Sequence, residues 1–157
     1  MIIINKPFQA FIWILFFQLI GFALGSITGS NMEWYHTITK SSLTPPNFVF
    51  PIVWSILYTL LALVGHFLWQ NRKEEKARHI LVLFIIQLVL NWLWTPIFFG
   101  WHLTGLALLD ILTIVAITIY IIIKSWANKY PIIAYVMLIY LLWLLFASYL
   151  NLVICIY

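Results

Sequence analysis

The residues of this chain most able to do chemistry are aromatic and amide side chains that recur at helical spacing. Three apolar segments carry them, four residues apart within each: Trp54 and Tyr58, Gln87 and Asn91, and Trp143, Ala147 and Asn151, with Tyr140 one turn before Trp143. Residues at this spacing share one face of a helix. Ring faces with a few amide and hydroxyl groups suit a flat, conjugated or sterol-like ligand. The same side chains also pack helices together, and that structural interpretation competes with the ligand site.

Groups for conventional catalysis are scarce. Asp110 is the only acidic residue within an apolar run. A bond to neighbouring helix groups is its expected role, and a proton or ligand role is the alternative. The single cysteine, Cys155, leaves no intrachain disulfide. The four histidines show no metal-ligand spacing: His36, His66, His79 and His102. Acid–base or metal catalysis therefore has little support, and we expect no metal site and no required cofactor.

Composition places the chain in a membrane. Of its 157 residues, 65% are hydrophobic and 8% are charged, whereas soluble domains carry about 25% charged residues. A soluble domain cannot hide so much apolar surface. The net charge of +4 is too sparse for a nucleic-acid footprint, so we expect no nucleic-acid partner.

Five apolar runs are long enough to cross a bilayer as helices: Phe8–Ile27, Asn47–Trp69, Ile80–Phe99, Leu103–Ile123 and Pro131–Tyr157. They lack the alternation of a barrel wall. The sequence predicts an all-α membrane protein, with one five-transmembrane-helix bundle over residues 1–157 and the lipid bilayer as its partner.

The basic residues sort by side of this bundle. If the N-terminus is on one side, seven basic residues lie on that side: Lys6, Arg72, Lys73, Lys76, Arg78, Lys124 and Lys129. Only Lys40 lies on the other. The positive-inside rule therefore predicts a cytoplasmic N-terminus and an outer C-terminus. The loop from about residue 28 to residue 44 would lie outside, over the mouth of the bundle.

Proline and glycine predict local irregularities. Pro45, Pro46 and Pro51 precede or interrupt the second run, so we expect an irregular or bent helix start there. Pro96 should kink the third run. Gly21, Gly25 and Gly29 repeat every fourth residue, a pattern of close helix approach within the bundle or across a dimer.

A long set of residues resembles the translocator protein family, also called tryptophan-rich sensory proteins or peripheral benzodiazepine receptors. The resemblance runs in order from the first loop to the end of the chain and rests on these positions: Trp34-Tyr35, Lys40, Pro45-Pro46-Asn47, Phe50-Pro51, Trp54, Leu57-Tyr58, Gln87, Asn91-Trp92, Phe98-Phe99, Asp110, Trp143, Ala147 and Leu150-Asn151. It implies a five-helix bundle, usually dimeric, that binds porphyrins, sterols and benzodiazepine- or isoquinoline-type ligands. Trp54, Tyr58, Asn91, Trp143 and Ala147 would line the pocket, under a lid that carries Trp34 and Tyr35.

Together, pattern and resemblance give these candidate ligand-binding residues: Trp34, Tyr35, Pro46, Trp54, Tyr58, Gln87, Asn91, Tyr140, Trp143, Ala147 and Asn151. Family members with a sterol-recognition pattern end it on a basic residue. Here Leu145 and Tyr149 are present, but no Lys or Arg follows. This favours tetrapyrrole binding over sterol transport, and the short N-terminus favours a bacterial cell membrane.

Several functions stay open at this point. The leading hypothesis is a porphyrin-binding sensor, carrier or sink that works as a homodimer. An enzyme that degrades porphyrin in light is an alternative, with Trp54 and Trp143 as candidate redox residues. Passive transport of apolar ligands such as sterols is another, and a scaffold whose aromatic residues only pack is the last.

Overall fold

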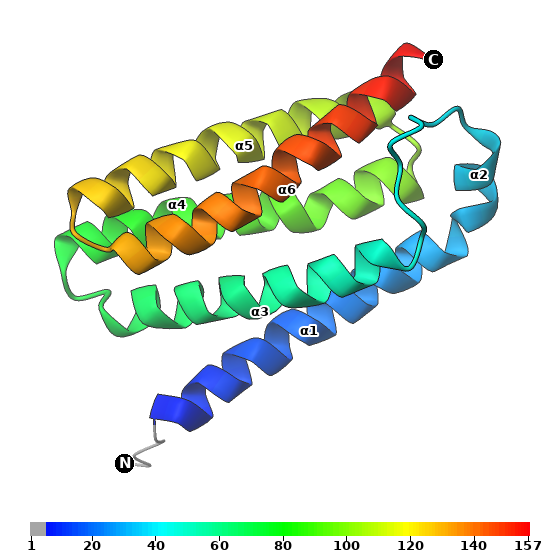
Figure 1. Cartoon of the computed structure of the whole chain (residues 1–157). Helices are drawn as coiled ribbons and strands as arrows, with labels where there is room; N and C mark the ends of the chain where they lie inside the picture. Colours follow the sequence, from blue (N-terminus) through cyan, green and yellow to red (C-terminus); the bar gives the residue numbers. More distant parts are fainter. Residues whose placement is uncertain (1–5) are drawn as a thin grey trace.

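The computed structural model describes residues 6–157, with side chains from Pro7 onward. Its long helices are α1 (Lys6–Ser30), α3 (Val49–Gln70), α4 (Glu75–Thr95), α5 (Thr104–Ala127) and α6 (Pro131–Ile156). A short helix α2 (Met32–Thr37) follows α1, and a π-helical turn η1 (Pro96–Gly100) extends α4 (Figure 1). All five long helices are long and apolar enough to span a membrane. Within the described residues no strand occurs, and the predicted all-α five-helix bundle is confirmed.

The helices form one bundle with two distinct ends. The start of α1, the α3–α4 connection and the α5–α6 connection lie at one end, while α2 and the C-terminus lie at the other (Figure 1). We call these the basic end and the α2 end. The basic end carries Arg72, Lys73, Lys76, Arg78, Lys124 and Lys129, whereas Lys40 follows α2. The segregation of charge read from the sequence therefore coincides with the two ends of the fold.

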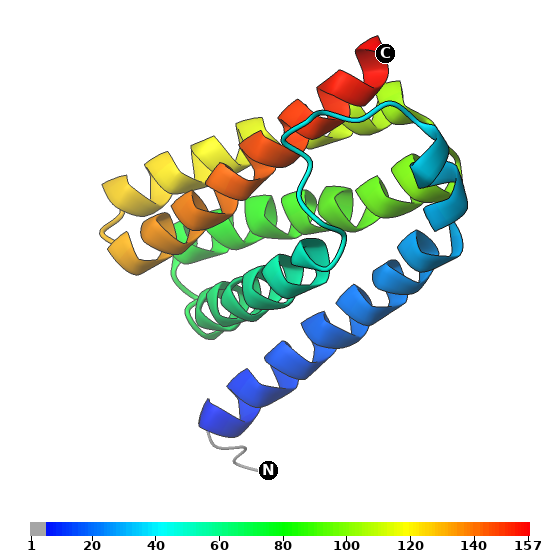
Figure 2. The ribbon, with the colours of Figure 1, turned by 45° about the vertical axis from the view of Figure 1, so that its right-hand side comes forward.

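The helix α1 lies on the outside of the bundle (Figure 2). It packs mainly on α3, while α5 packs against both α4 and α6. Phe17 is the only side chain of α1 in the buried core described here, and Phe11, Leu19 and Phe22 are among its exposed apolar residues. Every other long helix also shows large apolar side chains on its surface, as expected of helices that face lipid.

The prolines agree with the sequence predictions only in part. The helix α3 begins at Val49, after Pro45 and Pro46, and Pro51 lies in its first turn. The amides of a first turn have no partner within the helix, so proline costs little there. The expectation of a disturbed helix is therefore wrong at Pro51, whereas the chain through Pro45 and Pro46 is non-helical, as expected of an irregular entry. At Pro96 the chain widens into the π-helical turn, closed by a bond of 2.9 Å from Trp101 N to Pro96 O.

The glycine repeat serves two purposes rather than one. A Cβ atom on Gly21 would lie 2.7 Å from Tyr58 Cδ2, so α1 and α3 approach closely there. At Gly25 and Gly29 a Cβ would meet nothing within 4 Å. The prediction of close approach within the bundle is confirmed at Gly21 and wrong at Gly25 and Gly29, where the two helices have diverged.

Candidate functional site

A cavity of about 740 Å³ occupies the half of the bundle nearer α2. All five long helices contribute to its wall, together with α2 and η1. Its volume lies in the range of small-molecule sites, about 300–1,000 Å³. No Asp, Glu, Lys, Arg or His side chain is among the described residues that line it. The cavity is therefore suited to an apolar ring system held by stacking and by a few neutral hydrogen-bonding groups.

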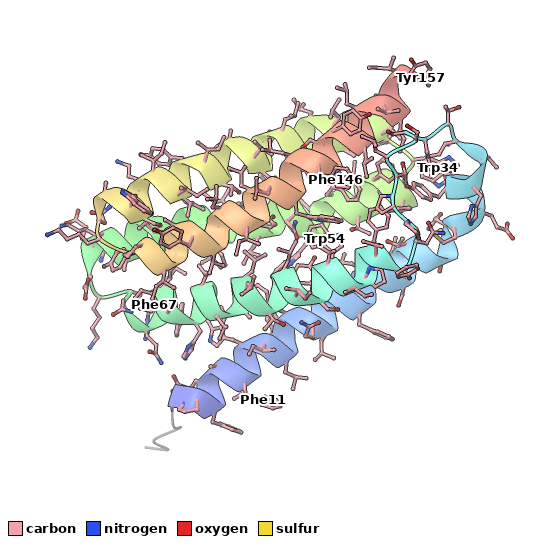
Figure 3. The ribbon with its side chains drawn as sticks, viewed as in Figure 1. Phe11, Trp34, Trp54, Phe67, Phe146 and Tyr157 are labelled. Carbon is pink, nitrogen blue, oxygen red and sulfur yellow. The ribbon has the colours of Figure 1, made fainter. Side chains whose placement is uncertain are left out.

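The structure brings most of the predicted site residues to this cavity. Its lining includes these: Tyr35, Trp54, Tyr58, Asn91, Trp143, Ala147 and Asn151. Trp54 points from α3 into the bundle, toward α6 (Figure 3). Four other candidates do not line it: Trp34, Pro46, Gln87 and Tyr140. Whether the lining residues bind a ligand stays a prediction, but their common location is a structural fact.

Asn91 joins three helices at the inner end of the cavity. The Tyr58 hydroxyl on α3 donates to Asn91 Oδ1 at 3.2 Å, and Asn91 Nδ2 donates to the Tyr140 hydroxyl on α6 at 2.9 Å. All three side chains are buried. Buried amides need such partners because there is no water to replace them. Tyr140 thus supports the wall from behind instead of forming it.

Asn151 makes a second junction, closer to α2. It accepts a bond of 3.2 Å from Trp94 Nε1 and donates through Nδ2 to the carbonyl of Thr104 at 2.9 Å. These bonds connect α6 with α4 and α5. Trp94 also stacks on Phe98 at 4.8 Å between ring centroids. Trp94 and Phe98 both line the cavity, and sequence reasoning left them out of the ligand set although Trp94 lies three residues after Asn91.

The α2 segment closes the cavity at its end of the bundle. Tyr35 is buried and lines the cavity, whereas Trp34 stacks on His102 at 4.0 Å between centroids. Lys40 Nζ donates to the carbonyl of Tyr35 at 2.6 Å, and the hydroxyls of Ser41 and Tyr149 are 3.0 Å apart. Burial raises the pKa of the Tyr35 phenol above its ordinary value. Trp34 therefore fixes the lid from outside, and Tyr35 is its inner surface.

Several polar side chains of the spanning helices have buried atoms without a hydrogen-bond partner, Gln87 and Asp110 among them. Gln87 is fully buried, and neither its amide nitrogen nor its oxygen has a hydrogen-bond partner. It lies one turn from Asn91 on α4, further from α2 than the cavity. One carboxylate oxygen of Asp110, Oδ2, is buried and also unpaired. Neither residue lines the cavity, and a ligand role for Gln87 gains no support from its position.

No group of three or more His, Cys, Asp or Glu side chains in residues 6–157 could hold a metal ion. The chemistry available at the cavity is instead that of indole, phenol and amide groups. Trp54 and Trp143, the two candidate redox residues, both belong to its wall. The indole nitrogen of Trp143 is buried without a hydrogen-bond partner.

The helix α1 contributes lining that the sequence reasoning missed. Gly21, Phe22 and Ser26 all face the cavity. The glycine repeat was the available signal, but it predicted helix packing, because small residues in spanning helices most often allow close approach. The divergence of α1 from α3 turns the same residues into a wall.

Comparison of the sequence with known proteins gives matches to one family. The model of the TspO/MBR family matches residues 12–157. The chain is 35% identical over 131 residues to the Translocator protein of Homo sapiens, which covers 80% of this chain and 75% of that protein. It is 35% identical over 134 residues to the Tryptophan-rich protein TspO of Archaeoglobus fulgidus, which covers 84% and 85%. It is also 40% identical over 68 residues to a Tryptophan-rich sensory protein of Cereibacter sphaeroides, which covers 43% and 41%.

Fold and site together define a multi-pass membrane protein whose five spanning helices enclose an aromatic, uncharged cavity. Both the family match and the two relatives at 35% identity cover most of the chain. The chain belongs to the TspO/MBR family of translocator and tryptophan-rich sensory proteins.

Proposed function

We propose that this protein binds tetrapyrroles, protoporphyrin in particular, in the cavity next to α2, and acts as a sensor, carrier or sink for them. Synthetic ligands of the benzodiazepine and isoquinoline type would occupy the same cavity. The observation that supports this most is the lining. Trp54 on α3 and Trp143 on α6 both line the cavity, and no charged side chain is among the described lining residues. Flat conjugated rings gain most from such a surface.

The hydrogen-bonding groups on the wall would orient the ligand. Asn91 and Tyr58 are already bonded to each other at the inner end, so they present only their remaining lone pairs and hydrogens. A porphyrin would therefore place its apolar edge toward Asn91. Its carboxylates would remain nearer the surface, because burying an unpaired carboxylate costs several kcal/mol or more.

A fluorescence titration tests this proposal. Purified protein in lipid nanodiscs is titrated with protoporphyrin while tryptophan emission is recorded, and we expect saturable quenching at micromolar ligand. Trp54→Phe and Trp143→Phe should each weaken binding, since phenylalanine offers less stacking surface. Trp126→Phe is the matched control, because Trp126 is exposed near the basic end of α5. Absence of quenching in the unaltered protein would refute the proposal.

Light-dependent degradation of the bound porphyrin is a second candidate function. It is favoured by the location of two tryptophans on the same cavity wall, where an excited porphyrin and dioxygen could react with their help. Illumination of the complex separates the two functions. A sink keeps its porphyrin absorption bands, whereas an enzyme converts them into those of one defined product. Bleaching without a defined product would argue against the enzyme.

The distribution of basic residues supports a proposal about the orientation of the protein. We propose a bacterial cell membrane, with the basic end in the cytoplasm, the C-terminus outside and a homodimer as the working unit. The basic residues at one end support this orientation. Labelling of Cys155 by a membrane-impermeant thiol reagent on intact cells tests it, because Cys155 is exposed near the C-terminus. Labelling only after the cells are opened would reverse the orientation.

A further inference from the structure

The cavity reaches the molecular surface at one opening. Its exposed lining residues on α1 are Phe22, Gly25, Ser26 and Gly29. The others are Pro51 and Ser55 on α3, with Asn47 just before that helix. Every remaining lining residue is buried or half-buried. The opening therefore lies between two spanning helices, where the surroundings of the protein are lipid.

The opening has a definite inner limit. Tyr58 lies against Gly21, leaving no room for a Cβ atom between α1 and α3. One turn further from α2, Gln18 Nε2 donates to the carbonyl of Ser55 at 2.8 Å and to the Thr59 hydroxyl at 3.0 Å. From Gly21 toward α2 the helices separate. The distance along α1 from Gly21 to Gly29 is about 12 Å, at a rise of 1.5 Å per residue.

Small residues keep this opening clear. Neither Gly25 nor Gly29 has an atom within 4 Å of the position a Cβ would take. No steric reason inside the protein requires glycine at either position. A larger side chain there would project into the gap between α1 and α3 without displacing its neighbours. Ser26 bonds back to the carbonyl of Phe22 and offers the gap little polarity.

The α2 end, in contrast, is held shut at several points. Trp34 is stacked on His102, Tyr35 packs on Phe99 at 5.4 Å between centroids, and Ser41 bonds to Tyr149. Opening the lid would break all of these contacts. Passage of a ligand through the opening between α1 and α3 would break none of these contacts.

We propose that the ligand moves between the cavity and the bilayer through the α1–α3 opening, in the leaflet nearer α2, while the α2 segment remains in place. The inference rests on the proposed binding of a tetrapyrrole in this cavity. It makes the bilayer, and not the aqueous phase, the immediate source and destination of the ligand. The hydrophobic ligand then never has to cross water to reach its site.

Exchange kinetics test the route. The protein is reconstituted into vesicles, protoporphyrin is delivered from donor vesicles, and tryptophan quenching gives the association and dissociation rates. We expect Gly25→Leu and Gly29→Leu to lower both rates about tenfold, as a blocked passage should. Gly105→Leu is the matched control, because its Cβ would also meet nothing within 4 Å but lies outside the cavity. Faster dissociation with unchanged association would mean a wall contact only and would overturn the proposal.

A second arm tests the lid. Ser41→Cys and Tyr149→Cys are joined by a short bifunctional thiol reagent in a Cys155→Ser background, which fixes the loop after α2 to α6. We expect exchange rates within about twofold of the unlinked protein, since no lid motion is required. A cross-link that stops exchange would place the route at the α2 end instead. If the unaltered protein shows no equilibrium binding at all, the proposed function fails. If it binds, but Gly25→Leu and Gly29→Leu leave the exchange rates unchanged, only the proposed route fails.

Discussion

The amide nitrogen of Asn91 on α4 donates a hydrogen bond of 2.9 Å to the hydroxyl of Tyr140 on α6. The same amide accepts the Tyr58 hydroxyl of α3 through its oxygen. Asn91 thus sets the spacing of the two helices that carry Trp54 and Trp143. The placement of the two tryptophans on the cavity wall therefore depends on a side chain that joins the helices rather than on either ring.

Replacement of Tyr140 by Phe should lower the stability of the bundle. It leaves the Asn91 amide hydrogen without an acceptor in a dry interior, at a cost of about 1 kcal/mol, since hydrogen bonds between spanning helices are worth roughly 0.6–2 kcal/mol. Asn91→Leu should lower the stability more, because it leaves the hydroxyls of both Tyr58 and Tyr140 without their hydrogen-bond partner. Equilibrium unfolding in mixed micelles measures both. Tyr135→Phe, on an exposed side chain of α6, is the control, and an equal loss there would contradict the argument.

Enlargement of Ala147 should block the cavity without unfolding the protein. Ala147 lines the cavity and is only half-buried, so an added side chain extends into empty space. We expect Ala147→Leu to weaken protoporphyrin binding at least tenfold, or about 1.4 kcal/mol, with little change in unfolding. Ala116→Leu changes an exposed alanine of α5 in the same way and should bind normally. Retained affinity in Ala147→Leu would place the ligand elsewhere.

The sequence predicted the bundle and most of the cavity wall because both follow from local periodicity. Long apolar runs define the helices, and four-residue spacing puts Trp54 beside Tyr58 and Ala147 beside Trp143. It did not predict which polar side chains face the cavity. Gln87 and Asn91 share a helical face, yet only Asn91 lines the cavity. The difference depends on how far the cavity extends along α4, and the bonded side chains of Tyr58, Asn91 and Tyr140 lie at its inner end.

The lack of distances between helices also explains why the sequence did not predict the different surroundings of the three glycines. Spacing shows that Gly21, Gly25 and Gly29 lie on one side of α1, but it gives no distance to the next helix. Only the crossing of α1 and α3 decides that Gly21 touches Tyr58 while Gly29 faces a gap. Likewise, nothing in the spacing of Trp34 predicts its partner, because the stack on His102 joins the first connection to the one between η1 and α5.

Gly21→Ala should destabilise the contact between α1 and α3. Its methyl group would lie 2.7 Å from the Tyr58 ring, which cannot move freely because its hydroxyl is bonded to Asn91. Overpacking of this kind costs about 1–3 kcal/mol. Gly25→Ala has room for its methyl group and should be neutral or slightly stabilising, since alanine favours helix by about 1 kcal/mol. Thermal unfolding of the two variants compares neighbouring turns of one helix, and equal losses would contradict the divergence of α1 from α3.

The basic end should lose stability in alkali through Tyr130. Its hydroxyl donates to Glu74 Oε2 at 2.7 Å. This hydrogen bond to the carboxylate, more than burial or the carboxylate's charge, raises the pKa of Tyr130 above its ordinary value. The folded protein therefore keeps this proton at a pH where the unfolded chain has released it. The stabilisation is complete below about pH 10, the ordinary tyrosine value. It declines as the pH rises through the higher pKa of Tyr130 in the folded protein.

Tyr130→Phe should remove this part of the alkaline loss of stability, whereas Tyr120→Phe, on an exposed tyrosine of α5, should retain it. The two unfolding profiles, followed with the ultraviolet absorbance of phenolate, would coincide if the bond to Glu74 had no effect.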